Sequence, residues 1–128
     1  MKRISFLLVG LFLGMTAMAQ SETDGIVGDW YNQEKDAVIE IYKESGKFHG
    51  KITWMLTPLD ENGNPKTDPL NPDESLQSRP RLGMVMMYDF EYDGDNVWDE
   101  GEVYDPKSGS TYSGMVTLTS ANNLDLKG

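Results

Sequence analysis

The chain has 128 residues, a formal net charge of −10 and no cysteine. This length allows one small domain with a single modest core. The absence of cysteine excludes disulfide bonds and a cysteine nucleophile. Nucleic acid and anionic lipid surfaces would repel so acidic a chain, and we expect no nucleic-acid partner.

The first residues have the layout of a secretory signal peptide. Lys2 and Arg3 give a positive start, residues 4–13 are almost wholly apolar, and a small-x-small cleavage site ends at Ala19. We therefore expect residues 1–19 to be removed and the mature protein to be exported, as a periplasmic or secreted protein. The apolar run is too short for a comfortable membrane span, so a retained anchor is the alternative, and we expect no transmembrane segment in the mature chain. Losing Lys2 and Arg3, with no acidic residue, changes the formal charge from −10 to −12.

Alternating apolar and polar residues mark short strands through the remaining chain, residues 20–128, which we interpret as one domain. No stretch has helical spacing over a helical length. The pattern predicts about seven antiparallel strands in an up-and-down meander, with the spacing of a sandwich or barrel. We expect them at residues 25–31, 36–43, 47–55, 82–92, 97–104, 111–119 and 124–127.

The two outer strands of such a meander are a structural problem, because they leave unpaired backbone groups unless the sheet closes. Closing a small barrel takes about eight strands. Either the first and last strands meet in a tight barrel, or a strand is missing and the barrel is incomplete at the C-terminus.

A long polar connection, at about residues 55–81, separates the third and fourth expected strands. Loops of this length are usually functional or disordered. Asp60, Asn62 and Asn64 have the spacing that opens an EF-hand calcium loop, but Pro65 stands where that loop needs Gly and Asn71 where it needs Glu. We therefore expect turns made by Asx side chains, with no metal and no cofactor.

Several stretches together resemble one exported bacterial family, catalogued as domain of unknown function twenty-one forty-seven. They are Ile26-Val27-Gly28-x-Trp30, Gly50-Lys51-Ile52-x-Trp54, the run from Pro58 to Asp68, Asn71-Pro72-Asp73, Arg79-Pro80-x-x-Gly83 and Tyr104-Asp105-Pro106-x-x-Gly109-x-x-Tyr112. The resemblance implies a small lipocalin-like (calycin-like) β-barrel and no established activity, substrate or cofactor. Family members usually continue with further strands, so the resemblance also implies that the C-terminal strands are missing here.

Two arginines, Arg79 and Arg81, flank a proline at the end of the long loop. A guanidinium group grips a carboxylate with paired hydrogen bonds. They could form a clasp with Asp60, Asp68 or Asp73 of the same loop, or hold an external anion.

A set of aromatic and methionine side chains is expected on the inner face of the sheet. These candidate ligand-binding residues are Trp30, Phe48, Trp54, Met84, Met86, Tyr88 and Phe90. They could line a pocket for an apolar molecule, since methionine adapts to varied apolar surfaces. They could equally fill the interior as a packed core.

The sequence thus favours a noncatalytic β-barrel protein that binds a small apolar or amphipathic ligand, with the long loop as its lid. An alternative is an interaction module of the cell envelope, which takes up a protein partner through the acidic loop and an open sheet edge. A minor alternative is a hydrolase, because carboxylates are abundant, although a hydrolytic site needs them to converge on a cleft.

Overall fold

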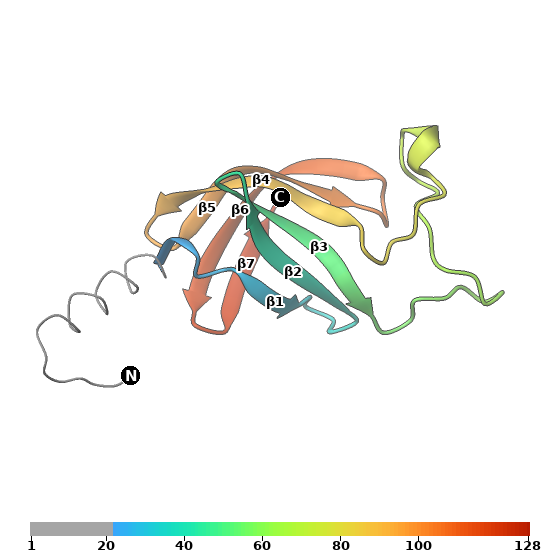
Figure 1. Ribbon diagram of the computed structural model, residues 1–128, viewed down its shortest axis with the longest axis horizontal. Coiled ribbons are helices and arrows are strands. Elements are labelled where there is room, and N and C mark those ends of the chain that lie inside the picture. Colours follow the sequence, from blue (N-terminus) through green and yellow to red (C-terminus); the bar gives the residue numbers. More distant parts are fainter. Residues whose placement is uncertain (1–21) are drawn as a thin grey trace, which may run out of the picture.

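The computed structural model describes residues 22–128, and the predicted signal peptide (residues 1–19) lies outside the described residues. Seven strands form one antiparallel sheet (Figure 1). They are β1 (Gly28–Tyr31), β2 (Ala37–Glu44), β3 (Lys47–Met55), β4 (Val85–Gly94), β5 (Val97–Asp105), β6 (Ser110–Ser120) and β7 (Asn123–Lys127). The predicted all-β, up-and-down meander is confirmed.

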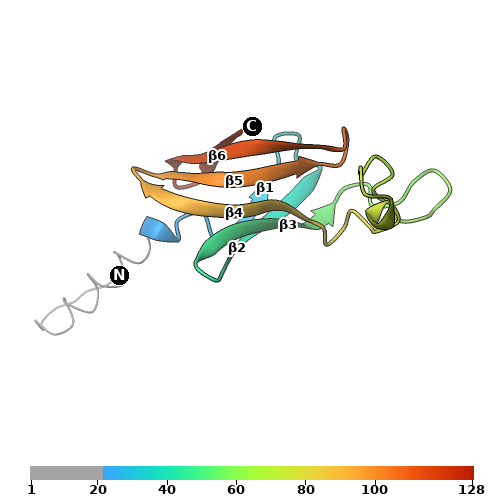
Figure 2. The same cartoon turned by 90° about the horizontal axis from the view of Figure 1, so that it is seen from above.

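The sheet curls into a half-barrel (Figure 2). Each strand pairs with its neighbours in chain order, so β1 and β7 are the two edges, and the described residues form no pairing between them. A tight barrel in which the first and last strands meet was one of the two expected arrangements. The structure does not show that arrangement, because β1 and β7 are not paired. Because antiparallel neighbours alternate in direction, β1 and β7 run the same way.

A hydrophobic core fills the end of the half-barrel that carries the β2–β3 and β4–β5 turns. Phe48 and Trp98 follow those turns directly, and both are at most 1% exposed. The fully buried core residues are completed by Ile26, Phe90 and Val116. Burying each such side chain contributes about 1.5–3 kcal/mol.

The segment before β1 closes this end of the half-barrel. The Trp98 indole donates a hydrogen bond to the Thr23 carbonyl oxygen (3.1 Å), and the Trp30 indole donates one to the Ile26 carbonyl oxygen (2.8 Å). These bonds hold residues 23–26 against the core, where Ile26 is fully buried. Among residues 22–128, no helix has the length and hydropathy needed to cross a bilayer.

The Phe90 ring lies against two glycines on neighbouring strands. A Cβ atom added to Gly101 would come within 2.4 Å of the ring, and one added to Gly114 within 2.8 Å. The absence of side chains at these two positions lets β5 and β6 approach the ring closely. The sheet can therefore curve around Phe90.

Two irregular positions change which face of the sheet the side chains occupy. Asp89 in β4 has φ = +62° and Glu100 in β5 has φ = +63°, which are left-handed conformations unusual for residues other than glycine. The irregularity at Asp89 brings Met87 and Phe90 to the core. The expectation that Tyr88 shares the inner face with Phe90 was wrong: Tyr88 pairs with the exposed Glu102, and its hydroxyl donates a hydrogen bond to the Val85 carbonyl oxygen.

Trp54 also lies away from its expected face. The pairing of β2 and β3 shifts between Val38 and Ile39, so Trp54 stands opposite Val38, while Ile52 pairs with Ile39. The indole is 42% exposed and meets the Tyr31 ring edge-to-face at 6.3 Å. The expectation of an inward Trp54 was wrong, because strict alternation breaks at the bulge.

We predict that replacing Gly101 with Ala lowers the free energy of unfolding by about 1–3 kcal/mol, since overpacking displaces neighbouring side chains. Urea denaturation measures this loss. The same substitution in a Phe90→Leu background should be less destabilising, because leucine leaves room for the added methyl group. Equal losses in both backgrounds would contradict the packing of Phe90 on Gly101.

Candidate functional site

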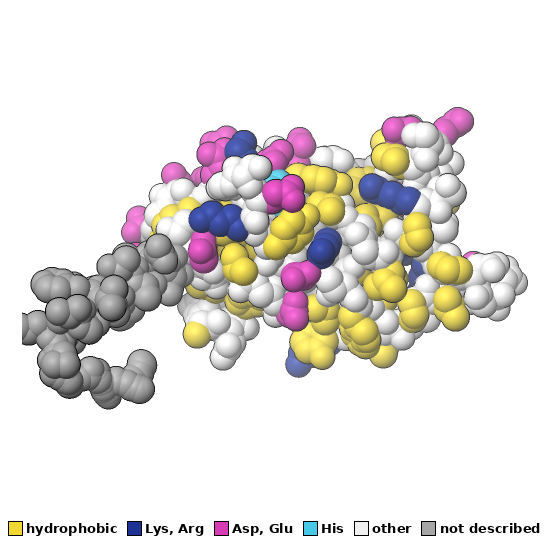
Figure 3. Space-filling model, in the orientation of Figure 1, with side chains coloured by type: hydrophobic (Ala, Val, Ile, Leu, Met, Phe, Trp, Pro, Cys, Tyr) yellow, Lys and Arg dark blue, Asp and Glu magenta, His cyan; other side chains and the backbone are white. Residues whose placement is uncertain are grey.

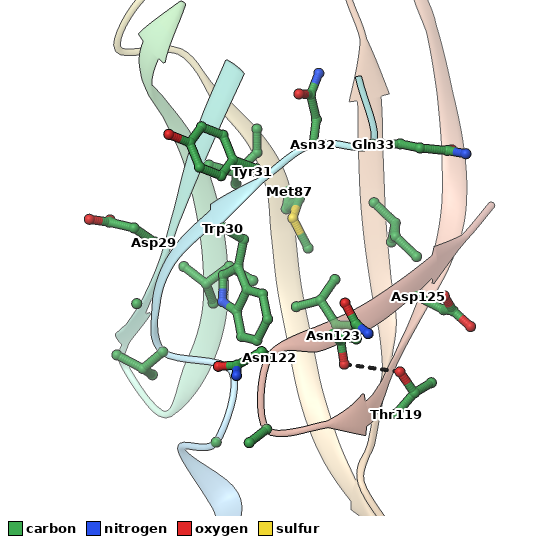
Figure 4. Close-up of a pocket in the computed structure, with 18 of the residues that line it drawn as sticks. Asp29, Trp30, Tyr31, Asn32, Gln33, Met87, Thr119, Asn122, Asn123 and Asp125 are labelled. Atoms are coloured by element: carbon green, nitrogen blue, oxygen red, sulfur yellow. Dashed lines mark hydrogen bonds between the residues drawn. The ribbon is translucent and has the colours of Figure 1, made fainter. Parts of the chain in front are cut away.

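A large hollow lies between the unpaired strands β1 and β7 (Figure 4). We call it the β1–β7 pocket; its volume is about 1390 Å³. Its lining includes the apolar side chains Trp30, Ile39, Ile41, Met86, Met87, Leu124 and Leu126. The pocket exists because the two edge strands do not meet, which leaves part of the inner sheet face open.

Trp30 stands near the middle of this pocket (Figure 4). It pairs with Ile39 across β1 and β2, and its ring packs against the hydrophobic core. The indole nitrogen is already bonded to Ile26, so the ring is fixed in orientation. Trp30 therefore offers a rigid aromatic surface to any molecule in the pocket.

Polar residues surround the pocket at both ends. Asn122 comes from the β6–β7 turn, Asn123 is the first residue of β7, and Asn32 and Gln33 come from the β1–β2 turn. The Asn32 side chain is committed to its own turn, where its oxygen accepts hydrogen bonds from the backbone amides of Asp36 and Ala37. Within residues 22–128, the other three carboxamides form no side-chain hydrogen bond, so they can contact a ligand.

A second hollow of about 310 Å³ lies at the C-terminal ends of β5 and β7. Val103, Pro106 and Tyr112 form much of its lining. It shares Met86 and Leu126 with the β1–β7 pocket. The two hollows are thus neighbours along one apolar surface.

The seven predicted ligand-binding residues separate into three groups. Trp30 and Met86 line the β1–β7 pocket. Phe48, Met84 and Phe90 are buried, with Phe48 and Phe90 in the hydrophobic core. Trp54 and Tyr88 line neither hollow.

Several residues that line the pocket were not among the predicted ligand-binding residues. Ile39 and Ile41 alternate regularly on β2, and Leu124 and Leu126 alternate on β7. This periodicity indicates that each pair shares a face. It carries no sign that β1 and β7 lie across an open gap, so the pairs could not be assigned to one pocket.

The long loop is organised around one buried carboxylate. Asp68 is fully buried; it accepts a hydrogen bond from the Tyr104 hydroxyl (2.6 Å) and one from the Asn71 carboxamide (2.9 Å). The Arg79 guanidinium forms an ion pair with Asp68 at 3.5 Å and lies over the Tyr104 ring. Burial and the bond to Asp68 raise the pKa of Tyr104 to about 12, so its hydroxyl keeps its proton at neutral pH.

The other proposed clasp residues serve separate turns. Asp60 accepts hydrogen bonds from the amides of Asn62 and Asn64, and Asp73 caps the short helix η1 (Glu74–Leu76) through Ser75. The hydrogen bonds to Ser75 lower the pKa of Asp73. Arg81 donates to the Thr67 carbonyl oxygen (2.7 Å). The structure thus brings Arg79 and Asp68 together and gives Asp60, Asp73 and Arg81 other partners.

The loop packs beside the β5–β6 turn. A Cβ atom added to Gly109 would lie 2.1 Å from the Leu70 carbonyl oxygen, so the two segments are in close contact. Residues 56–82 line neither hollow, and the loop extends away from the sheet in Figure 1. It braces one end of the half-barrel and is not the expected lid.

The described residues offer no clear metal centre. Among residues 22–128, no three His, Cys, Asp or Glu side chains gather as a ligand cluster. The sole histidine, His49, stacks with Tyr42 and accepts a hydrogen bond from the Asp89 amide (3.2 Å).

Comparison of the chain with family models assigns it to a family. Residues 28–128 match the model described as "Uncharacterized protein conserved in bacteria (DUF2147)". The chain belongs to this family. The predicted resemblance to this family is therefore confirmed. A search of curated proteins found no match to the chain.

A solved structure supports the same fold. The half-barrel is similar to a chain described as "Protein HP1028 from the human pathogen Helicobacter pylori belongs to the lipocalin family". The TM-score is 0.63, the sequence identity is 24%, and the similarity covers 79% of this chain and 69% of the other. The lipocalin-like fold predicted for this DUF2147 member is confirmed.

We predict that Arg79→Ala lowers the free energy of unfolding by about 1–3 kcal/mol, because it removes the cation beside a buried carboxylate. Lys47→Ala is the matched control, since Lys47 pairs with Glu91 at the exposed surface. Such surface pairs contribute at most about 1 kcal/mol. Urea denaturation compares the variants, and equal losses would show that Arg79 does not stabilise the Asp68 cluster.

Proposed function

We propose that this protein is an exported, noncatalytic binder of a small apolar or amphipathic molecule, held in the β1–β7 pocket. The observation that carries this proposal is the pocket itself, a hollow of about 1390 Å³ with Trp30 at its centre and an apolar floor. Ligand sites are typically concave and mostly apolar, with a few polar groups that orient the ligand. The pocket has each of these properties.

The lipocalin-like fold supports the same proposal. Barrels of this size can hold one small ligand in their interior, as lipocalins do. In this chain the core fills one end of the half-barrel and leaves the inner face beside β1 and β7 unfilled. Space for a ligand and a stable core therefore exist in one small domain.

The sequence of the first 19 residues supports the export part of the proposal. Expression of the full chain in a bacterium, followed by fractionation and N-terminal sequencing, should give a periplasmic or secreted protein that begins at Gln20. A protein that keeps Met1 and stays in the cytoplasm would contradict export.

A second candidate function is supported by the two free sheet edges. β1 and β7 each leave one side unpaired within residues 22–128. An extended segment of a partner protein could add to such an edge through backbone hydrogen bonds. In that case deletion of pocket side chains would leave partner binding intact, whereas proline substitutions in β7 would abolish it.

Ligand binding is tested with the neutral dye N-phenyl-1-naphthylamine, whose fluorescence rises in apolar surroundings. We expect saturable binding that native mass spectrometry assigns to one site. Leu126→Glu should weaken it at least about tenfold, because a carboxylate would then stand in the apolar lining. Leu56→Glu is the control: Leu56 is 63% exposed and lines neither hollow.

Circular dichroism should show that both variants keep the β-sheet spectrum, since Leu126 is itself partly exposed. If the wild-type protein binds no dye, or if both variants bind it equally well, the β1–β7 pocket is not the ligand site.

A further inference from the structure

Four charged residues border the β1–β7 pocket, two of each sign: Asp29, Lys35, Asp125 and Lys127. Successive side chains of a strand point to opposite faces, so Asp29 is opposed to Trp30, and Asp125 to Leu124 and Leu126. Figure 4 shows both carboxylates directed away from the cavity. The same alternation directs Lys127 away from the face that Leu126 occupies. Lys35 belongs to the β1–β2 turn, and Asn32 and Gln33 of this turn lie at the opposite end of the pocket from Asn122 (Figure 4). A charged head group beside Asn122 would therefore meet no counter-ion directed into the pocket from β1 or β7.

The carboxamide of Asn122 gives the pocket a neutral polar end. Asn122 lies in the β6–β7 turn and lines the pocket together with Trp30 (Figure 4). A carboxamide both donates and accepts hydrogen bonds. It can therefore bind a hydroxyl or amide group without a change of protonation.

The apolar part of the pocket continues away from this end along β7. Leu124 follows the turn directly, and Leu126 borders both the β1–β7 pocket and the second hollow. Met86 also borders both. This arrangement suits an extended hydrocarbon chain that begins near Trp30 and runs toward the second hollow.

Electrostatics distinguishes anionic, cationic and neutral head groups of a ligand. The chain carries a formal net charge of −10, and Figure 3 shows acidic side chains spread over one face with lysines and arginines among them. This field repels an anionic head. A cationic head would be attracted from solution, but it would lose hydration inside the pocket without a carboxylate to replace it. A neutral head has neither disadvantage.

We propose that the ligand is a neutral single-chain amphiphile, with its hydroxyl or amide head beside Asn122 and its chain along Leu124 and Leu126. This inference rests on the proposed function, because it assigns the ligand class of the same pocket. The head group is defined by its chemistry: uncharged, and able both to donate and to accept hydrogen bonds.

The test uses three probes with chains of similar length: 1-decanoylglycerol, decanoate and decyltrimethylammonium. Each probe is titrated into the protein with bound N-phenyl-1-naphthylamine, at concentrations below the one at which the probe forms micelles. Loss of dye fluorescence measures how tightly the probe binds. We expect 1-decanoylglycerol to bind at least about tenfold more tightly than either charged probe, since an unpaired charge is costly to bury. Tighter or equal binding of decanoate or decyltrimethylammonium overturns the neutral-head inference and leaves the proposed function standing. Failure of all three probes and of the dye overturns both.

A charge variant tests where the head group lies. Asn122→Lys places a cation at the polar end of the pocket, where it attracts a carboxylate. The ratio of the affinity for 1-decanoylglycerol to the affinity for decanoate should therefore fall at least about threefold. Asn62→Lys is the control, because it changes the net charge equally at an exposed loop position outside the pocket. If the two variants shift the preference equally, the head group does not lie beside Asn122.

Discussion

The packing of the Phe90 ring against Gly101 and Gly114 is the constraint on which the half-barrel depends. It brings three consecutive strands, β4 to β6, around one aromatic side chain. Close packing of this kind leaves no space for an added methyl group, so it fixes the curvature locally. Phe48, Trp98 and Val116 then complete a core at one end, closed by residues 23–26.

The open pocket is a consequence of the same arrangement. Because the core occupies the end of the half-barrel near the β2–β3 and β4–β5 turns, the inner face beside β1 and β7 is filled less completely. Trp30 is placed at this boundary, with its ring against the core on one side and the pocket on the other. A ligand in the pocket would therefore extend the apolar interior without replacing any core residue.

The fold was largely predictable from the sequence, because period-two alternation marks the strands and glycine marks the β2–β3, β4–β5 and β5–β6 turns. The faces were less predictable. The left-handed conformation at Asp89 cannot be read from an aspartate in an alternating run, and it transfers Tyr88 from the expected face to the other. The bulge beside Val38 has the same effect on Trp54. The pocket could not be predicted, because it depends on how β1 and β7 lie relative to each other. Local sequence patterns contain no information on that placement.

The ion pair of the long loop was also only partly predictable from the sequence. Its arginines and aspartates indicated an ionic clasp, and Asp68 was one of three equivalent candidates. The choice among them depends on Tyr104, which lies 36 residues further along the chain and donates the shortest hydrogen bond to Asp68. That partner becomes apparent only when β5 and the loop are placed together. The loop then packs against the β5–β6 turn at one end of the half-barrel.

The central claim is that a ligand occupies the space beside Trp30, and fluorine NMR of protein labelled with 5-fluorotryptophan tests it most directly. The chain has three tryptophans, one in the pocket, one exposed and one in the core. During titration with 1-decanoylglycerol, the Trp30 resonance should shift and saturate, while the Trp54 resonance stays unchanged. Saturable binding that leaves the Trp30 resonance unmoved would contradict the account.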